Sequence, residues 1–151
     1  MSLVSSGKEA TLESIRHAMK NDLSTLQNMG VFKKRVQKLI SKMGFKGYSY
    51  YNLLCPGDPP IFTTIPPAVW NDYHSQNFHD HDIILSYGKS NNDPTLYSSL
   101  LRQLKWLPYK TELTMKNEEI EKFYRASGIL DMYLIPFKDE GKSHMLAILD
   151  M

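Results

Sequence analysis

The side chains best suited to metal chemistry form the run His79-Asp80-His81-Asp82, with His74 five residues before it. Imidazole and carboxylate groups are ligands for transition metals, so this cluster could hold a metal-dependent catalytic centre. Successive residues of an extended segment point to opposite sides, however, so His79 and His81, which would share one side, would make only an incomplete site. We expect a solvated polar turn here and keep a metal-dependent enzyme as a minor alternative.

The chain shows none of the standard catalytic sequence motifs. The sequence lacks a Gly-rich phosphate loop, a Gly-x-Ser-x-Gly nucleophile elbow and a His-Glu-x-x-His zinc motif. Cys55 could act as a nucleophile, but it precedes Pro56 at the end of an apolar segment, where a small buried residue is the more common case. We therefore expect no enzymatic reaction and no cofactor.

A wider set of aromatic and polar residues ends at Asp82. It reads Pro67-Ala-Val-Trp70, then Tyr73, then Gln76-Asn77-Phe78, then Asp82. This pattern resembles the autoinducer-binding domain of LuxR-family transcription regulators, the acyl-homoserine lactone receptors of quorum sensing. Residues 43–54 are similar to the first strand of that family, and residues 126–136 are similar to its final helix-to-strand junction. The resemblance extends over residues 22–151.

The resemblance implies a role for several side chains. An acyl-homoserine lactone has an amide N–H and two carbonyls that cannot be left unpaired in an apolar pocket. Trp70 would donate its indole N–H to the lactone carbonyl, Asp82 would accept the amide N–H, and Tyr73 would supply a hydroxyl near the amide carbonyl. Trp106 corresponds to a second tryptophan of the family, and Leu134 to a residue of the pocket wall. Without the family pattern, Trp70 would be a core aromatic residue and Asp82 a helix-end or turn acceptor.

Some residues depart from the family pattern. Met132 and Leu134 stand where a glycine and a hydroxyl residue are usual, Pro66 replaces a tyrosine, and Ile83 replaces a proline. Bulkier and less polar residues on the last strand shrink the pocket and remove a ligand contact. We therefore expect weak or no binding of common unsubstituted lactones.

Hydrophobic periodicity predicts the elements that would position these residues. Helices are expected over residues 12–26, 32–43, 67–78, 95–106 and 117–126, the last two capped by Asp93-Pro94 and Asn117. Strands are expected over residues 45–55, 61–65, 132–137 and 144–150, and a polar loop over 87–92. Tight hairpins predict an antiparallel sheet that the helices must cover. The fold class is α/β: an α-β-α sandwich around an antiparallel sheet of about five strands, PAS/GAF-like.

Composition narrows the class of protein. The 151 residues are 42% hydrophobic and 23% charged, which is ordinary for a globular protein, and we expect one sensor domain over residues 1–151. The helix-turn-helix domain that normally follows in the LuxR family would then be absent from this chain. One cysteine suits a reducing cytoplasm. The sequence has no stretch of about 18 apolar residues, so we expect no membrane span.

The net charge of +2 argues against a nucleic-acid-binding surface. The densest basic run, Lys33-Lys34-Arg35 with Lys38 and Lys42, falls in a predicted helix, and we expect it to form a solvated face. Contact with DNA would then require a helix-turn-helix domain.

Two functions remain open from the sequence. The first is a homodimeric sensor that binds a small molecule such as an acyl-homoserine lactone, and Trp70 with Asp82 favours it. The second is a ligand-independent dimerisation or anti-activator module, whose own side chains fill the pocket and which pairs with a full-length regulator to silence it. Met132 and Leu134 favour this second function.

Overall fold

Five antiparallel strands form one sheet at the centre of the computed structural model, which describes residues 29–54, 57–139 and 141–151. The strand order is β2-β1-β5-β4-β3. The strands are β1 (Gly47–Asn52), β2 (Phe62–Thr63), β3 (Thr95–Leu96), β4 (Asp131–Asp139) and β5 (Lys142–Asp150). The helices are α2 (Met29–Lys42), α3 (Pro67–Ser75), the short 3-10 helix η2 (Phe78–Asp80), α4 (Ile83–Ser90), α5 (Tyr97–Lys105) and α6 (Glu112–Ala126).

The hairpin of β4 and β5 is the middle of the sheet, and both of its faces are buried. Side chains alternate between the faces because the period of a strand is two residues. Leu134 of β4 and Ala147 of β5 face one side, while Ile135 and Leu146 face the other. Burial on both faces explains why β5 reads as a nearly continuous apolar run rather than an alternating one.

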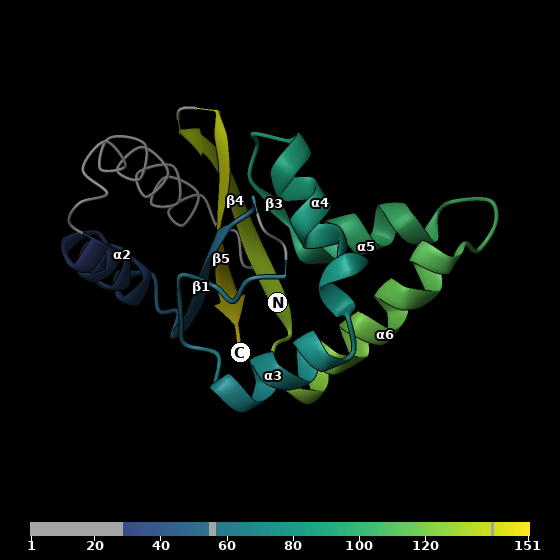
Figure 1. Ribbon diagram of the computed structural model, residues 1–151, viewed down its shortest axis with the longest axis horizontal. Coiled ribbons are helices and arrows are strands. Elements are labelled where there is room, and N and C mark those ends of the chain that lie inside the picture. Colours follow the sequence, from purple (N-terminus) through teal and green to yellow (C-terminus); the bar gives the residue numbers. More distant parts are fainter. Residues whose placement is uncertain (1–28, 55–56, 140) are drawn as a thin grey trace.

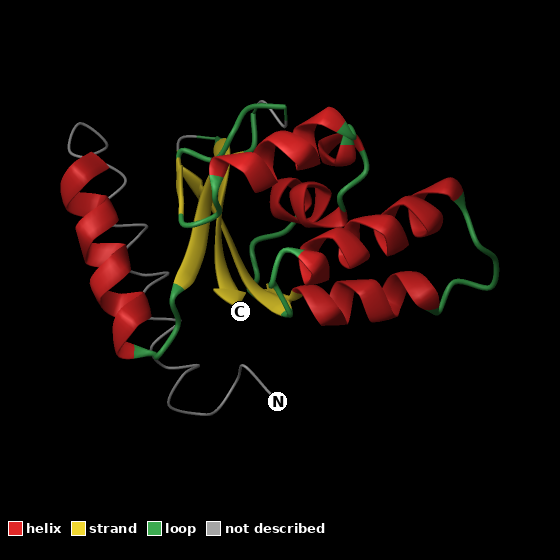
Figure 2. Cartoon of the chain, turned by 90° about the horizontal axis from the view of Figure 1, so that it is seen from below, coloured by secondary structure: helices red, strands yellow, loops and turns green. Residues whose placement is uncertain are grey.

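Helices cover the sheet on both sides. Helix α2 packs on one face, where Val36 and Ile40 join the core. Helices α3 to α6 lie over the opposite face, so the sheet stands between two helical layers (Figures 1 and 2). This arrangement confirms the predicted α-β-α sandwich with a five-stranded antiparallel sheet.

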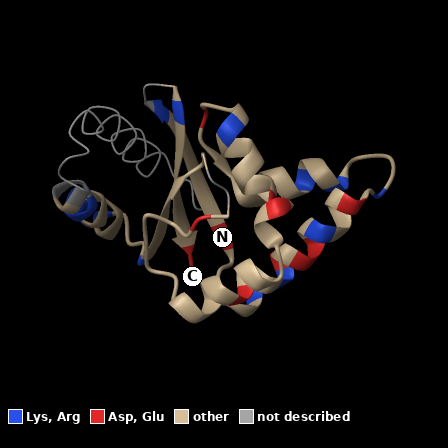
Figure 3. Ribbon diagram, in the orientation of Figure 1, with Lys and Arg blue, Asp and Glu red and all other residues tan. Residues whose placement is uncertain are grey.

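The basic run of α2 lies on the outer side of that helix. Lys33, Lys34 and Arg35 are exposed, while Val36 and Ile40 of the same helix are buried. Figure 3 shows positive charge on α2 and mixed positive and negative charge along α6. The basic residues of α2 therefore form the solvated helix face that the sequence predicts.

The elements around the predicted site begin close to where the sequence places them. Pro67 occupies the first turn of α3, where its missing N–H costs no hydrogen bond. The hairpin of β1 and β2 is antiparallel, as expected. Helix α6 begins earlier than predicted, at a capping box in which the Thr111 and Thr114 side chains bond reciprocally to the backbone. The prediction that Asn117 caps α6 is therefore wrong, since the helix begins at Glu112 and Asn117 lies in its interior turns.

Two corrections concern the segment after Asp82. Residues 83–90 form helix α4 where the sequence analysis predicts a polar loop from residue 87. Gly88 allows this helix to approach the sheet, because a Cβ there would lie 2.6 Å from Leu53 Cδ1 and 3.1 Å from Met145 Sδ. Asp93-Pro94 does not cap α5, which begins at Tyr97 after the short edge strand β3 has paired with β4.

Some predicted features lie outside the described residues. They are the helix over residues 12–26 and the junction at Cys55 and Pro56. Within the part of the chain that the structure describes, no helix is long and apolar enough to cross a membrane.

Candidate ligand-binding site

The carboxylate of Asp82 is buried in the core between the sheet and the helices. Asp82 is 3% exposed and is the N-cap of α4, where its Oδ1 accepts the Ile84 N–H at 3.1 Å. The other oxygen, Oδ2, accepts the Tyr73 hydroxyl at 2.8 Å and the Tyr124 hydroxyl at 2.5 Å. Helices α3, α4 and α6 thus each contribute one residue to this polar group, which we call the Asp82 cluster: Tyr73, Asp82 and Tyr124.

Burial controls the protonation of the Asp82 cluster. Desolvation raises the pKa of Asp82 above its ordinary value, and the hydrogen bonds from Tyr124, Tyr73 and the Ile84 amide act in the opposite direction. Burial and the neighbouring Asp82 charge raise the pKa of both Tyr73 and Tyr124. The two phenols therefore remain protonated donors at neutral pH.

Aromatic rings surround the Asp82 cluster. The Trp70 ring stacks on Tyr73 with centroids 5.1 Å apart, and Tyr73 stacks on Tyr124 at 6.0 Å. Tyr97, from the first turn of α5, meets Tyr124 edge-on at 5.6 Å. The Tyr97 hydroxyl is buried, and the described residues offer it no hydrogen-bond partner. The helical side of the core is thus rich in aromatic surface with polar atoms at its centre.

A small cavity lies beside these rings. Its volume is about 10 Å³, which is room for about one water molecule. Trp70 and Tyr73 line it, whereas Asp82 does not; Tyr73 and Tyr124, which both line the cavity, donate their hydroxyls to the carboxylate. The residues around the cavity are Tyr51, Ile65, Val69, Trp70, Tyr73, Phe123, Tyr124 and Ile129.

The last two predicted site residues lie in very different places. Leu134 is fully buried in the same apolar core as Tyr73 and Tyr124. Met132, two residues earlier on the same face of β4, is 1% exposed. Trp106 is 80% exposed at the C-terminal end of α5 and is not part of that core. The aromatic residue that α5 contributes to the core is Tyr97. The structure therefore brings Trp70, Tyr73, Asp82 and Leu134 into one region and leaves Trp106 outside it.

Comparison with protein families is consistent with this geometry. The family model described as the autoinducer binding domain matches residues 31–147 of the chain. The chain belongs to the autoinducer-binding domain family. This family is the N-terminal, signal-sensing part of LuxR-type regulators, so the chain has a sensing role of the quorum-sensing type. Comparison with curated proteins finds no match.

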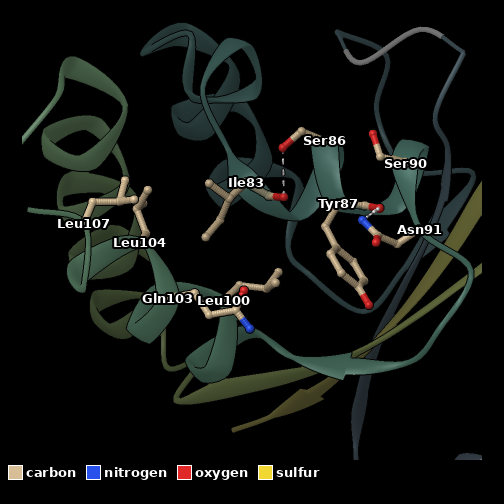
Figure 4. Close-up of a pocket in the computed structure, with 9 residues that line it drawn as sticks. All are labelled: Ile83, Ser86, Tyr87, Ser90, Asn91, Leu100, Gln103, Leu104 and Leu107. Atoms are coloured by element: carbon tan, nitrogen blue, oxygen red, sulfur yellow. Dashed lines mark hydrogen bonds between the residues drawn. The ribbon is translucent and has the colours of Figure 1, made fainter.

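A second hollow in this autoinducer-binding domain is an open groove between α4 and α5 (Figure 4). Its volume is about 410 Å³, and it is open to solvent rather than enclosed by the sheet. Apolar side chains of both helices and a polar rim line it: Ile83, Ser86, Tyr87, Ser90, Asn91, Leu100, Gln103, Leu104 and Leu107. None of the predicted site residues faces this groove.

The histidine-rich run does not assemble a metal centre among the described residues of the domain, where no three His, Cys, Asp or Glu side chains are placed to hold an ion. His74 and His79 stack with their rings 4.9 Å apart and nearly parallel. Asp82, the last residue of the run, points into the core instead and caps α4. The run therefore ends as a helix cap.

Sequence reasoning missed two residues of the site, both on α6: Tyr124, and Asn117, which bonds to the backbone of His81 and Ile83 on either side of Asp82. The available signal for Tyr124 was its spacing, since Ile120 and Tyr124 lie four residues apart on the buried face of that helix. Nothing in the sequence pairs Tyr124 with Asp82, because the contact joins residues 42 positions apart.

Proposed function

We propose that this domain senses a small amphipathic amide of the acyl-homoserine lactone class for a LuxR-type regulator. The observation that carries the proposal is the Asp82 cluster, a buried carboxylate that meets two phenols inside an apolar core. Burying a carboxylate costs free energy unless its hydrogen bonds are made, so this position requires donors; groups of the chain itself supply them in this structure, and a ligand amide can take the place of one of them. Family membership supports a small molecule as the source of that donor.

In this proposal four of the five predicted site residues have one task each. Asp82 accepts the amide N–H of the ligand, and the Tyr73 hydroxyl, which donates to Asp82 Oδ2 in this structure, turns to donate to the amide carbonyl of the ligand. Trp70, which lines the cavity, donates its indole N–H to the lactone carbonyl. Leu134 forms part of the apolar wall on the sheet side. Trp106 has no task, because it lies outside the core.

Space is the limiting quantity for such a ligand. Pockets for small molecules commonly have volumes of about 300–1,000 Å³, whereas the cavity beside Trp70 holds about 10 Å³. A ligand must therefore displace side chains before it fits. We expect common unsubstituted lactones to bind this chain weakly for that reason.

The filled core supports a second candidate function, the ligand-independent module that pairs with a full-length regulator and silences it. Every donor to the Asp82 carboxylate already comes from the chain itself, and Met132 and Leu134 fill the sheet side. In this case no signal is needed for a stable domain.

The remaining parts of the proposal concern partners and place. We propose that the domain forms a homodimer, that it reaches DNA only through a helix-turn-helix domain, and that it works in the cytoplasm. A LuxR-type regulator acts on DNA, which supports the cytoplasm as the compartment.

Native mass spectrometry of the 151-residue chain with a panel of acyl-homoserine lactones tests the proposal. We expect a mass increase of one lactone per chain for at least one member, weak for unsubstituted short chains. Thermal unfolding with and without the same lactones is the second readout, because a ligand that binds only the folded state raises the midpoint. Absence of any mass shift or midpoint change across the panel would contradict the sensor and favour the ligand-independent module.

A further inference from the structure

The two hydrogen bonds on Asp82 Oδ2 occupy the acceptor positions that a ligand would need. A carboxylate oxygen has about two lone-pair sites, and Oδ2 already accepts from Tyr73 and from Tyr124. Oδ1 accepts the backbone N–H of Ile84 and is aimed at the start of α4. An incoming amide N–H therefore meets a carboxylate on which three of about four acceptor sites are already used, both sites of Oδ2 among them.

The contact from Tyr124 is the shorter of the two phenol bonds, 2.5 Å against 2.8 Å for Tyr73. Tyr124 comes from α6 and is 4% exposed. Its ring also fills space beside the small cavity that Trp70 lines. One side chain thus occupies both the polar and the apolar part of the site.

We propose that Tyr124 is an internal substitute for the ligand, an autoinhibitory side chain that must leave Asp82 before an acyl amide can bind. The inference rests on the proposed sensing function and names the regulation of that same site. The Tyr124 hydroxyl stands in for the ligand amide N–H, and its ring stands in for ligand atoms beside Trp70.

This exchange keeps the carboxylate satisfied in both states. When the ligand is absent, the Tyr124 hydroxyl donates to Asp82; when it is present, the ligand amide donates instead. No state leaves the buried acceptor unpaired, so the domain folds without its signal. Occupancy then depends on the difference in affinity between two donors for one carboxylate, which is the condition for a ligand-shifted equilibrium.

Calorimetric titration of the 151-residue chain with N-hexanoyl- and N-dodecanoyl-homoserine lactone tests the proposal in three variants. Tyr124→Ala removes the hydroxyl and the ring, and we expect it to bind at least one lactone at least tenfold more tightly than the wild type. Tyr124→Phe removes only the hydroxyl, and we expect a smaller gain. Tyr48→Phe is the matched control, because Tyr48 is an equally buried tyrosine on the α2 side of the sheet whose hydroxyl accepts from Gln37 Nε2; its lactone affinity should equal that of the wild type.

Thermal unfolding covers the case in which Tyr124→Ala does not fold. Tyr124→Phe keeps the ring but loses the hydroxyl that donates to Asp82. This variant should therefore unfold at a lower midpoint than the wild type, and added lactone should raise its midpoint more. Equal affinity of a lactone-binding wild type and its folded Tyr124 variants would overturn the inference and leave the sensing function standing. Failure of every folded variant to bind any lactone would overturn both.

Discussion

Asn117 holds the backbone on both sides of Asp82. Its Nδ2 donates to the His81 carbonyl at 2.8 Å, and its Oδ1 accepts the Ile83 N–H at 3.1 Å. The same Nδ2 donates to the Leu113 carbonyl within α6 at 2.8 Å, so both N–H groups and the oxygen of the amide have partners. Helix α6 therefore fixes where α4 begins, and with it the direction in which the Asp82 carboxylate points.

Asn117→Leu should destabilise the domain by about 1–3 kcal/mol, because it leaves the His81 carbonyl and the Ile83 N–H without their partner. Urea unfolding followed by circular dichroism measures the difference. Gln103→Ala, on the exposed side of α5, is the control and should stay within about 0.5 kcal/mol of the wild type. A loss no larger than that of the control would show that the Asn117 bonds contribute nothing net.

The ionisation of Asp82 should make stability depend on pH. Its pKa in the folded state is raised from 3.8 by burial, so the folded domain holds this proton more tightly than the unfolded chain does. The stability from protonation is fully present below about pH 3.8 and is lost as the pH rises through the raised folded pKa. The free energy of unfolding of the wild type should therefore fall relative to Asp82→Asn as the pH rises above 4.

Urea unfolding of both proteins between pH 3.5 and pH 7, about the range in which a raised carboxyl pKa acts, gives this difference directly. Asn is a good N-cap and keeps the shape of the side chain, so the comparison isolates the charge. A difference that stays constant or rises with pH would contradict a raised pKa for Asp82.

The main elements could be predicted from the sequence because their hydrophobic patterns are long. Helices α2 and α6 contain buried residues at helical spacing, and β5 of the β4–β5 hairpin contains a nearly continuous buried run. Helix α4 and strand β3 have only eight and two residues. Their signal is too short for periodicity, and contacts with the rest of the fold decide them.

The site could be predicted only as far as local pattern and family resemblance reach. Trp70, Tyr73 and Asp82 lie within a single stretch, and the structure places Tyr73 and Trp70 in ring contact and Tyr73 on Asp82. Tyr124 and Asn117 join this stretch from α6, and no local pattern shows that packing. Only the family resemblance places Trp106 in the site, whereas in the structure it is the C-cap of α5 and is exposed to solvent.

Asp82→Asn should weaken lactone binding, most clearly in the Tyr124→Ala background where the site is open. Asn preserves the shape but exchanges a charge-assisted acceptor, which contributes about 1.5–3 kcal/mol, for a neutral one, which contributes about 0.5–1.5 kcal/mol. The difference of about 1–1.5 kcal/mol is about fivefold to tenfold in affinity. Calorimetry of the single and double variants measures it. Identical affinities with Asp and with Asn at this position would remove Asp82 from recognition of the ligand amide.

The 151-residue chain should not bind DNA specifically. The exposed basic residues of α2 are offset by acidic residues elsewhere, and the net charge is only +2. A gel-shift assay with a random library of duplexes should show at most weak binding that disappears with added salt. Selection of one sequence, with retention at high salt, would mean that this chain itself carries a DNA-reading surface.

The sheet side of the site offers the last test, at Met132 and Leu134. Both side chains project from β4 into the core that holds Tyr73 and Tyr124, and both are essentially inaccessible to solvent. A ligand beside them meets filled volume and no donor: overpacking commonly costs about 1–3 kcal/mol, and an unpaired buried amide group about 1–3 more. The double change Met132→Gly with Leu134→Thr removes the bulk and adds a hydroxyl, so it should improve lactone affinity by tenfold or more, at about 1.4 kcal/mol per factor of ten.

The glycine will cost some stability in the strand. Ile135→Val is the control for a loss of stability that leaves lactone affinity unchanged. Ile135 is equally buried but faces α2, so its truncation should lower the unfolding free energy by about 0.5–1.5 kcal/mol without changing lactone affinity. Combining the double change with Tyr124→Ala opens the site from the sheet and from α6 together. Because both alterations act on one enclosed volume, their gains in affinity should not add. Tight lactone binding by the unmodified chain, with no gain from the double change, would show that β4 does not line the ligand site.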